Sequence, residues 1–185
     1  MSLWGNDIKP KNLTDAEKKE VFANTKGWVR EAGSILSGNG NTSADPEVLV
    51  AIGGLSANMG SANITELEFI TTAFDKSDGG TLQVRARFNE PVTVTGTPQL
   101  TVVNDSRANH TLSYASGSTT NELVFSLTIA AANSATNAGD VLSIGANAMS
   151  LNSGTIKDTN ESGTNATITN SSAIGTAAGT ITVAA

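Results

Sequence analysis

Apolar and polar residues alternate along the chain from about Ile64 onward. A period of two is the pattern of a half-buried antiparallel strand, because successive side chains point to opposite faces of a sheet. The segment 81–88 shows this pattern clearly and is predicted to be a strand that covers a core. Its apolar face consists of Leu82, Val84, Ala86 and Phe88, and its polar face of Gln83, Arg85 and Arg87.

The same alternation recurs in four further segments: 98–103, 110–116, 121–130 and 140–145. Other strands are expected over 66–74, near Ile156 and Ile168, and over 180–185. Seven or more short strands separated by turn residues are typical of a β-sandwich. Residues 61–185 are therefore predicted to form an all-β domain, an antiparallel β-sandwich.

Two prolines punctuate the stretch "FNEPVTVTGTPQLTVV" between two of these strands. Pro91 and Pro98 cannot donate ladder hydrogen bonds, so proline is confined to edges, strand starts and bulges. Pro91 is expected to interrupt the strand pattern or to lie at a sheet edge, just after the strand 81–88. The residues 95–98, Thr-Gly-Thr-Pro, are expected to turn into the next strand.

The first sixty residues have a different composition, with six of the eleven Lys and Arg residues and both tryptophans. Thr14 and Glu17 form a Thr-x-x-Glu capping pattern, which predicts a helical turn from Asp15 to about Phe22. Apolar strands are expected over 27–29 and 46–55. A flexible loop is expected at 37–46 and a linker at 53–63. Two parts are therefore predicted, an N-terminal anchor or assembly region (1–60) and the β domain (61–185).

The charge of the chain argues against two classes of partner. It holds 11 Lys and Arg against 17 Asp and Glu, a net charge of −6, and its basic residues are dispersed. Nucleic acids and anionic membrane surfaces both require clustered positive charge, so neither is expected as a partner. No segment approaches the roughly 18 apolar residues of a membrane span, and the start lacks the pattern of a signal peptide. The chain contains no cysteine, so no disulfide supports it.

The residues that could carry chemistry are few. His110 is the only histidine and follows the turn-like text "NDSRAN", so it is expected to be an exposed loop residue. With one histidine and no cysteine, no zinc or iron site is expected. Glu66 and Glu68 could serve as paired carboxylates, but the alternation points them to solvent opposite the apolar face. No catalytic, cofactor-binding or metal-binding residue is predicted.

A second carboxylate pair, Asp75 and Asp78, lies in "FDKSDGG" and is predicted to belong to a turn. The two glycines that follow, Gly79 and Gly80, can supply the positive φ angles that such a turn requires.

Three motifs, "FNEPVTVTGTPQL", "YASGSTTNELVFSLTI" and "MSLNSGTIKD", resemble bacterial immunoglobulin-like (Ig-like) repeats. The likeness is to the SwmB-like type found in large cyanobacterial and proteobacterial cell-surface adhesins, and it covers about residues 65–183. It implies an Ig-like β-sandwich and leaves the function open. Members often carry an acidic, calcium-suited loop after the "LVFSLTI"-like strand. Here the loop 130–141 has Asp140 as its only carboxylate, so no calcium site is expected.

The opening of the chain carries a second resemblance. "MSLWG", a Lys-Pro-Lys element and a "GWV" strand are similar to the start of virion structural proteins of T4-like marine cyanophages. This likeness covers about 55 residues. It implies a non-enzymatic virion protein of a tailed phage, expected to be a capsid decoration protein assembled in the host cytoplasm.

Leu3, Trp4 and Trp28 are the expected partner-binding residues of the N-terminal region, because Trp is enriched at interface hot spots. Local packing is the alternative role for the two tryptophans. The major capsid protein is the main expected partner. Other virion proteins, host surface polysaccharide and further copies of this chain are additional candidates.

Three alternative functions are kept beside this one. The chain could be a tail, neck or fibre component of the virion, or an adhesive or carbohydrate-binding module of a bacterial surface protein. The third alternative is a lyase or hydrolase on a β scaffold. It would require a convergent cluster of titratable groups, which the sequence does not indicate.

Overall fold

A computed structural model describes residues 20–24, 27–32, 47–51, 61–161 and 163–185. The chain divides into two compact units, 1–57 and 58–185. The boundary expected at residue 60 falls close to this division.

The first unit contains a three-stranded antiparallel sheet in the order β1-β2-β3. Its strands are β1 (Val21–Asn24), β2 (Gly27–Arg30) and β3 (Glu47–Ala51). The strand predicted at 27–29 is confirmed, and the one predicted at 46–55 is confirmed over 47–51. Val21, Phe22 and Val29 are buried.

The helical turn predicted from Asp15 to Phe22 was wrong at its C-terminal end. Val21 and Phe22 lie in β1, where Phe22 pairs with Val29 of β2. A β-branched and an aromatic residue with a cross-strand partner favour a strand over a helix. The rest of the predicted turn up to residue 19 lies outside the described residues, as do the loop at 37–46 and most of the linker at 53–63.

The second unit is built on a ten-stranded sheet and one short helix, α2 (Ser172–Ala177). The strands form the path β12-β6-β9-β8-β7-β10-β13-β5, with β4 added beside β6 and β11 beside β7. They are β4 (Ile64–Phe69), β5 (Phe74–Asp75), β6 (Gly80–Thr95), β7 (Gln99–Asn104), β8 (His110–Ser116), β9 (Thr120–Ile129), β10 (Val141–Ser143), β11 (Met149–Ser150), β12 (Thr155–Asp158) and β13 (Ile181–Ala184).

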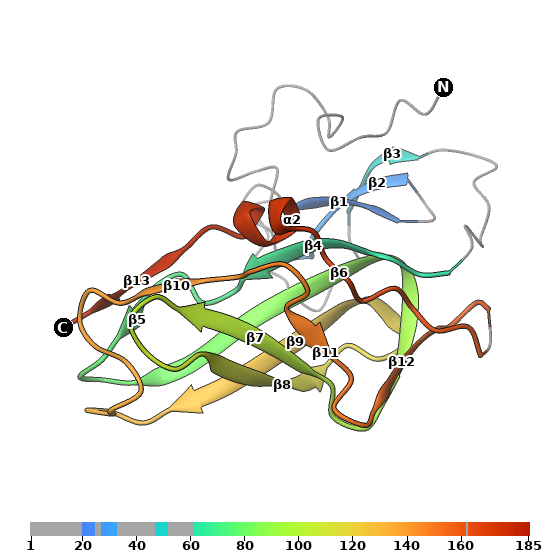
Figure 1. Ribbon diagram of the computed structural model, residues 1–185. Helices are drawn as coiled ribbons and strands as arrows, with labels where there is room; N and C mark the ends of the chain where they lie inside the picture. Colours follow the sequence, from blue (N-terminus) through green and yellow to red (C-terminus); the bar gives the residue numbers. More distant parts are fainter. Residues whose placement is uncertain (1–19, 25–26, 33–46, 52–60, 162) are drawn as a thin grey trace. The chain divides into compact units, whose positions relative to one another are not determined.

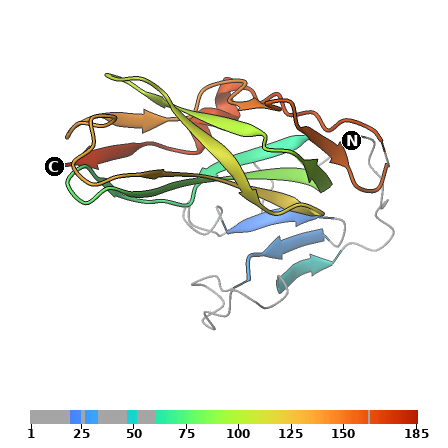
Figure 2. The same cartoon turned by 90° about the horizontal axis from the view of Figure 1, so that it is seen from below.

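The predicted β-rich fold is confirmed for this unit, which also contains the short helix α2. The sheet curls strongly on itself into a half-barrel, as the views in Figures 1 and 2 show together. The purely antiparallel prediction was wrong at one pair, because β13 runs parallel to β5. The strands are connected in one curled, mixed sheet.

The core lies inside the curl and is filled by the residues that the alternation placed on the apolar faces. Leu82, Val84, Ala86 and Phe88 are at most 1% exposed. Leu100 and Val102 of β7, Leu123 and Phe125 of β9, and Leu142 of β10 are fully buried. The strands predicted from period-two patterns at 81–88, 98–103, 110–116, 121–130 and 140–145 are thus confirmed, the last as the three-residue β10.

The Pro91 prediction was wrong in one respect, because β6 continues through this residue to Thr95. The register with β9 jumps between Arg87 and Val92, and β6 pairs with β12 over Val92–Thr95. Pro91 therefore falls where pairing with β9 is interrupted, and its missing N–H leaves no ladder bond unmade. The turn predicted at residues 95–98 is confirmed, with Gly96 at φ 76° and β7 beginning at Gln99.

Three other elements differ from expectation. The strand predicted at 66–74 is two strands, β4 and β5, because the chain bends after Phe69 and the Thr71 side chain bonds to the backbone of β6. Ile168 lies outside any strand, in a segment where only isolated β-bridges form.

Helix α2 was not predicted, because six residues are too few for a periodic signal. It is capped by the Ser171 side chain, and Gly175 lies against the backbone of Ile144 and Gly145, where a Cβ would not fit.

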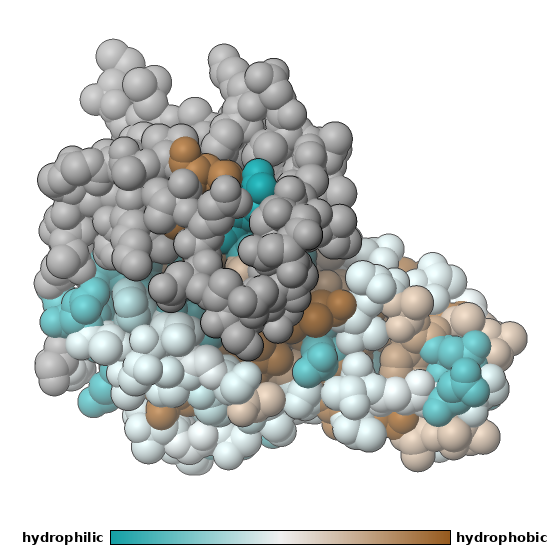
Figure 3. All heavy atoms as spheres, turned by 180° about the vertical axis from the view of Figure 1, so that it is seen from behind, coloured by the Kyte–Doolittle hydropathy of each residue, from teal (hydrophilic) through white to brown (hydrophobic). Residues whose placement is uncertain are grey.

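The surface of this unit reflects the short polar residues of the composition. In Figure 3 most described residues on the visible face are of intermediate hydropathy, with strongly hydrophilic and strongly hydrophobic ones among them. Ile70 and Leu151 are the large hydrophobic side chains that are exposed among the described residues, each at 38%.

Asp158 holds the start of the second unit against the β12 turn. Its Oδ2 accepts the N–H of Ala62 at 2.8 Å, and its Oδ1 accepts the N–H groups of Asn160 and Glu161 at 2.7 and 2.8 Å. The side chain is buried, so its removal would leave backbone donors without an acceptor.

Replacing Asp158 with alanine should lower the free energy of unfolding by about 2 kcal/mol, the cost of leaving buried donors unsatisfied. Urea unfolding measures the change. The control is Lys157→Ala, at the neighbouring position on the other face of β12, which should cost about 0.5 kcal/mol or less. Equal losses in the two variants would contradict the role given to Asp158.

Candidate functional site

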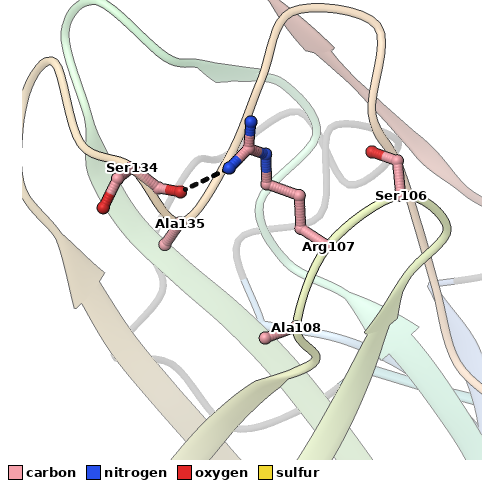
Figure 4. A pocket seen from close by; sticks show the side chains of 5 residues that line it. All are labelled: Ser106, Arg107, Ala108, Ser134 and Ala135. Carbon is pink, nitrogen blue, oxygen red and sulfur yellow. Dashed lines mark hydrogen bonds between the residues drawn. The ribbon is translucent and has the colours of Figure 1, made fainter.

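Two loops at one end of the curled sheet approach each other and enclose the candidate site. The β7–β8 loop and the β9–β10 loop are joined by Arg107, whose Nη1 donates to the Ser134 carbonyl oxygen at 3.1 Å. Figure 4 shows the guanidinium reaching across from one loop to the other. The open pocket between them has a volume of about 470 Å³ and is lined by Ser106, Arg107, Ala108, Ser134 and Ala135.

The buried carboxylate of Asp140 is hydrogen-bonded to residues of both loops. It accepts hydrogen bonds from the Ser106 hydroxyl, from Asn104 Nδ2 at 2.9 Å and from the Asn137 N–H at 2.8 Å. The bond from Ser106, then that from Asn104, together with smaller effects of Asn137 and Arg107, hold the pKa of Asp140 below its usual range. Asp140 therefore stays ionised and links residues of the two loops through charge-assisted bonds.

Asn104 is the second connection in this network. Its Oδ1 accepts the N–H groups of Ser106 and Arg107 at 3.0 and 3.1 Å, and this closes the β7–β8 turn. Its Nδ2 donates to Asp140 and also lies 3.5 Å from His110 Nε2. An Asn at the end of a strand commonly closes a turn in this way.

The prediction that His110 is an exposed loop residue was wrong. It is the first residue of β8, pairs with Val102 of β7 and is 4% exposed. Its position shares the parity of Leu112, and the alternation that identified the strand would have placed it on the core face. Burial lowers the pKa of His110, and the charge of Asp140 opposes this shift.

Ser106, Asp140 and His110 are close together but do not have the connectivity of a Ser-His-Asp triad. The contacts run from Ser106 to Asp140, then to Asn104, and then to His110. In a triad the histidine bonds to the serine, whereas here the serine hydroxyl donates directly to the carboxylate. The network is suited to holding two loops in place.

The paired carboxylates Glu66 and Glu68 lie on the face of β4 opposite the core, as expected, but they are not simply solvated. Arg87 Nη1 lies 3.0 Å from Glu66 Oε2, and Arg85 Nη2 lies 2.8 Å from Glu68 Oε2. Glu122 of β9 adds a third carboxylate, 2.9 Å from Arg87 Nε. The sequence missed this cluster because its members come from three strands that the register alone aligns.

The turn predicted around Asp75 and Asp78 is confirmed. Asp75 Oδ1 accepts the N–H and the hydroxyl of Ser77, and Gly79 and Gly80 have φ angles of 68° and 145°. The Ser77 hydrogen bonds lower the pKa of Asp75. This carboxylate is used to close a turn.

Among residues 61–161 and 163–185, together with the described strands of the first unit, no three His, Cys, Asp or Glu side chains are grouped so as to hold a metal ion. The oxygens of Asp140 in the 130–141 loop are engaged by N–H and O–H donors. In the same part of the chain, no helix has the length and apolar character to cross a membrane.

The expected partner-binding residues are only partly visible. Leu3 and Trp4 lie outside the described residues. Trp28 is half-buried in the central strand β2, between Ala23 of β1 and Val50 of β3. Its place in a small sheet fits local packing as well as a contact with a partner.

Comparisons with protein-family models, with curated proteins and with solved structures find no match for this chain.

Proposed function

We propose that the chain is a non-enzymatic structural protein of a tailed-phage virion, with capsid decoration as its role. In this proposal residues 1–60 attach the chain to the particle and residues 61–185 form a displayed Ig-like domain. The resemblance of the opening residues to cyanophage virion proteins suggests the particle, and the three motifs between Phe88 and Asp158 suggest the Ig-like type.

The observation that carries the proposal is the division of the chain into two compact units, one of which has a complete core of its own. A self-sufficient β domain can be displayed without help from the surface that holds it. Its loops are closed by short polar side chains, Asp75, Asp140 and Asp158, which suits a rigid module.

An Ig-like sandwich is the finer form of the fold that we propose for the second unit. The inward residues of β6 and β9 share one core with those of β7, β10 and β13, strands from the other part of the curled sheet. A shared core between two parts of a sheet is the packing on which a sandwich depends.

Attachment is proposed to act by binding alone. The major capsid protein is the main partner, and repeated copies on a particle multiply weak contacts through avidity. Other virion proteins, host surface polysaccharide and neighbouring copies of this chain remain candidates for contact with the displayed domain.

The proposal is tested on gradient-purified particles of the phage that encodes the chain. Mass spectrometry should find the full-length protein in intact virions, and electron cryomicroscopy should place its density on the head. Density on the tail, neck or fibres would overturn the decoration role, and absence from virions would overturn the proposal altogether.

Trp28 provides a residue-level test of attachment. If Trp28 is a hot spot, Trp28→Ala should weaken binding of the full chain to undecorated heads by about 2 kcal/mol, and Trp28→Phe should retain most of the binding. A sedimentation assay with measured occupancy gives the two affinities. Unchanged occupancy in both variants would leave Trp28 with a packing role.

A second candidate function is favoured by the pocket between the two loops. An open pocket with a mixed polar and apolar lining, at the end of a β domain, suits an adhesive or carbohydrate-binding module of a bacterial surface protein. Fractionation separates the two functions, because such a module would be found with the cell envelope and not with phage particles.

A further inference from the structure

We propose that Asn104, His110 and Asp140 form an acid-sensitive latch, which holds the β7–β8 loop in place while His110 is neutral and releases it when His110 is protonated. This goes beyond the proposed function, and its test does not depend on where the protein is assembled.

Three contacts determine the orientation of the Asn104 side chain. Oδ1 accepts from two backbone N–H groups, those of Ser106 and Arg107. Nδ2 donates to Asp140 Oδ2, an ionised carboxylate oxygen that can only accept. If the amide were reversed, Nδ2 would face the two backbone N–H groups and Oδ1 would face the carboxylate of Asp140. Neither arrangement allows a hydrogen bond, so only one orientation is compatible with these partners.

The orientation of Asn104 bears on the protonation state of the His110 ring. Since Nδ2 of Asn104 is a donor, His110 Nε2 can bond to it across the long 3.5 Å distance only as an acceptor. A neutral imidazole has one donor and one acceptor nitrogen, so this contact is a hydrogen bond only when the proton of His110 is on Nδ1. The contact therefore favours the neutral ring in this tautomer.

Protonation of His110 places two donors, Nε2–H and Nδ2–H, against each other. The conflict is relieved if the Asn104 amide turns, but this breaks its bonds to Ser106, Arg107 and Asp140. It is also relieved if the ring leaves its buried position at the start of β8. Either movement loosens the loop, and with it the Arg107 bond that reaches the Ser134 carbonyl.

The charged groups around the ring set the direction of the equilibrium. Among the described residues, Asp140 from the β9–β10 loop is the charge that acts on His110 and favours protonation. Arg107, on the β7–β8 loop, acts on Asp140, and Asp105 is engaged with the N–H of Val141. Burial outweighs Asp140 and lowers the pKa of His110, which keeps the latch closed at neutral pH.

The stability that the neutral His110 ring gives to the folded state depends on pH. The folded state disfavours the charged ring, so the stabilisation is fully present above the unfolded pKa of about 6.5 and is lost as the pH falls through the lower folded pKa. Asp140 remains ionised over this range because its own pKa is lowered. The loop should therefore open in acid, at a pH below the usual titration range of histidine, while the sheet remains folded.

The experiment is an NMR titration of the full chain between pH 7.5 and 4.5, following the His110 ring and the exchange protection of backbone amides. Protection factors of Ser106 and Arg107 should fall about tenfold as His110 titrates, equivalent to about one hydrogen bond. Amides of Val84 and Phe125 in the sheet report on global unfolding and should remain protected. Loop protection that does not follow the His110 titration would overturn the latch.

His110→Gln is the matched variant, since its amide oxygen can accept from Asn104 but does not titrate in this range. The Ser106 and Arg107 amides should then stay protected throughout the titration. The same acid-induced loss in this variant would assign the opening to another group and refute the role of His110. If the variant does not fold, the wild-type comparison of loop and sheet amides decides the matter alone.

Discussion

Replacing Arg87 with methionine should lower the free energy of unfolding at pH 7 by about 3–5 kcal/mol, the typical cost of breaking a buried ion pair by removing one partner. The Arg87 side chain is 2% exposed and lies 2.9 Å from Glu122, 3.0 Å from Glu66 and 3.5 Å from Glu68. Its loss would leave three carboxylates facing the single guanidinium of Arg85. Urea unfolding of both proteins measures the difference.

The cost at Arg87 has a second source besides the lost contacts. Without Arg87 the three carboxylates of the cluster repel each other, and this repulsion adds to the loss of the ion pairs. The control is Arg85→Met, since Arg85 is 18% exposed and mainly bonded to Glu68. We expect this change to cost only about 1 kcal/mol. Similar costs at the two positions would contradict this account of the cluster.

Phe125→Ala should also cost about 3–5 kcal/mol, because it empties the centre of the core. Phe125 is fully buried in β9, and its ring meets that of Tyr114 edge to face, with centroids 6.2 Å apart and planes at 72°. It lies between Val84 of β6 and Tyr114 of β8 in the register. Denaturant midpoints and m-values would show the loss and test whether unfolding stays two-state.

Two companion variants define the size of that effect. Phe125→Leu keeps most of the buried apolar volume and should lose less than the alanine variant. Thr128→Ala changes an exposed residue on the same strand and should stay within about 0.5 kcal/mol of the wild type. A loss at Phe125 no greater than that at Thr128 would show that the core is not packed around this ring.

Much of the fold was accessible from local patterns. The period-two segments predicted the long strands and their buried faces, because side-chain alternation is a property of each strand alone. The curl of the sheet, the parallel β13–β5 pair and the passage of β6 through Pro91 depend on which strands meet. Those pairings join residues far apart in sequence, such as Phe74 and Val183, and no local signal reports them.

The candidate site was missed for the same reason. Asn104 and Asp140 are 36 residues apart, and no sequence motif around either residue predicts their contact. His110 was placed in a loop because the polar text before it outweighed its parity with Leu112. Glu66 and Glu68 were placed on the correct face, but their partners Arg85 and Arg87 could be identified only once β4 was aligned with β6.

Strand β6 sets the order in which this domain can assemble. It pairs with β4 before it in sequence, and with β9 and then β12 after it. During synthesis β6 therefore has only β4 as a pairing partner until β9 (Thr120–Ile129) and later β12 (Thr155–Asp158) leave the ribosome. Such distant contacts slow folding to about milliseconds or longer, and an unsatisfied strand edge is open to other chains meanwhile. Arg85 and Arg87 place charge on this strand, and charged residues on an unpaired strand disfavour association with other chains.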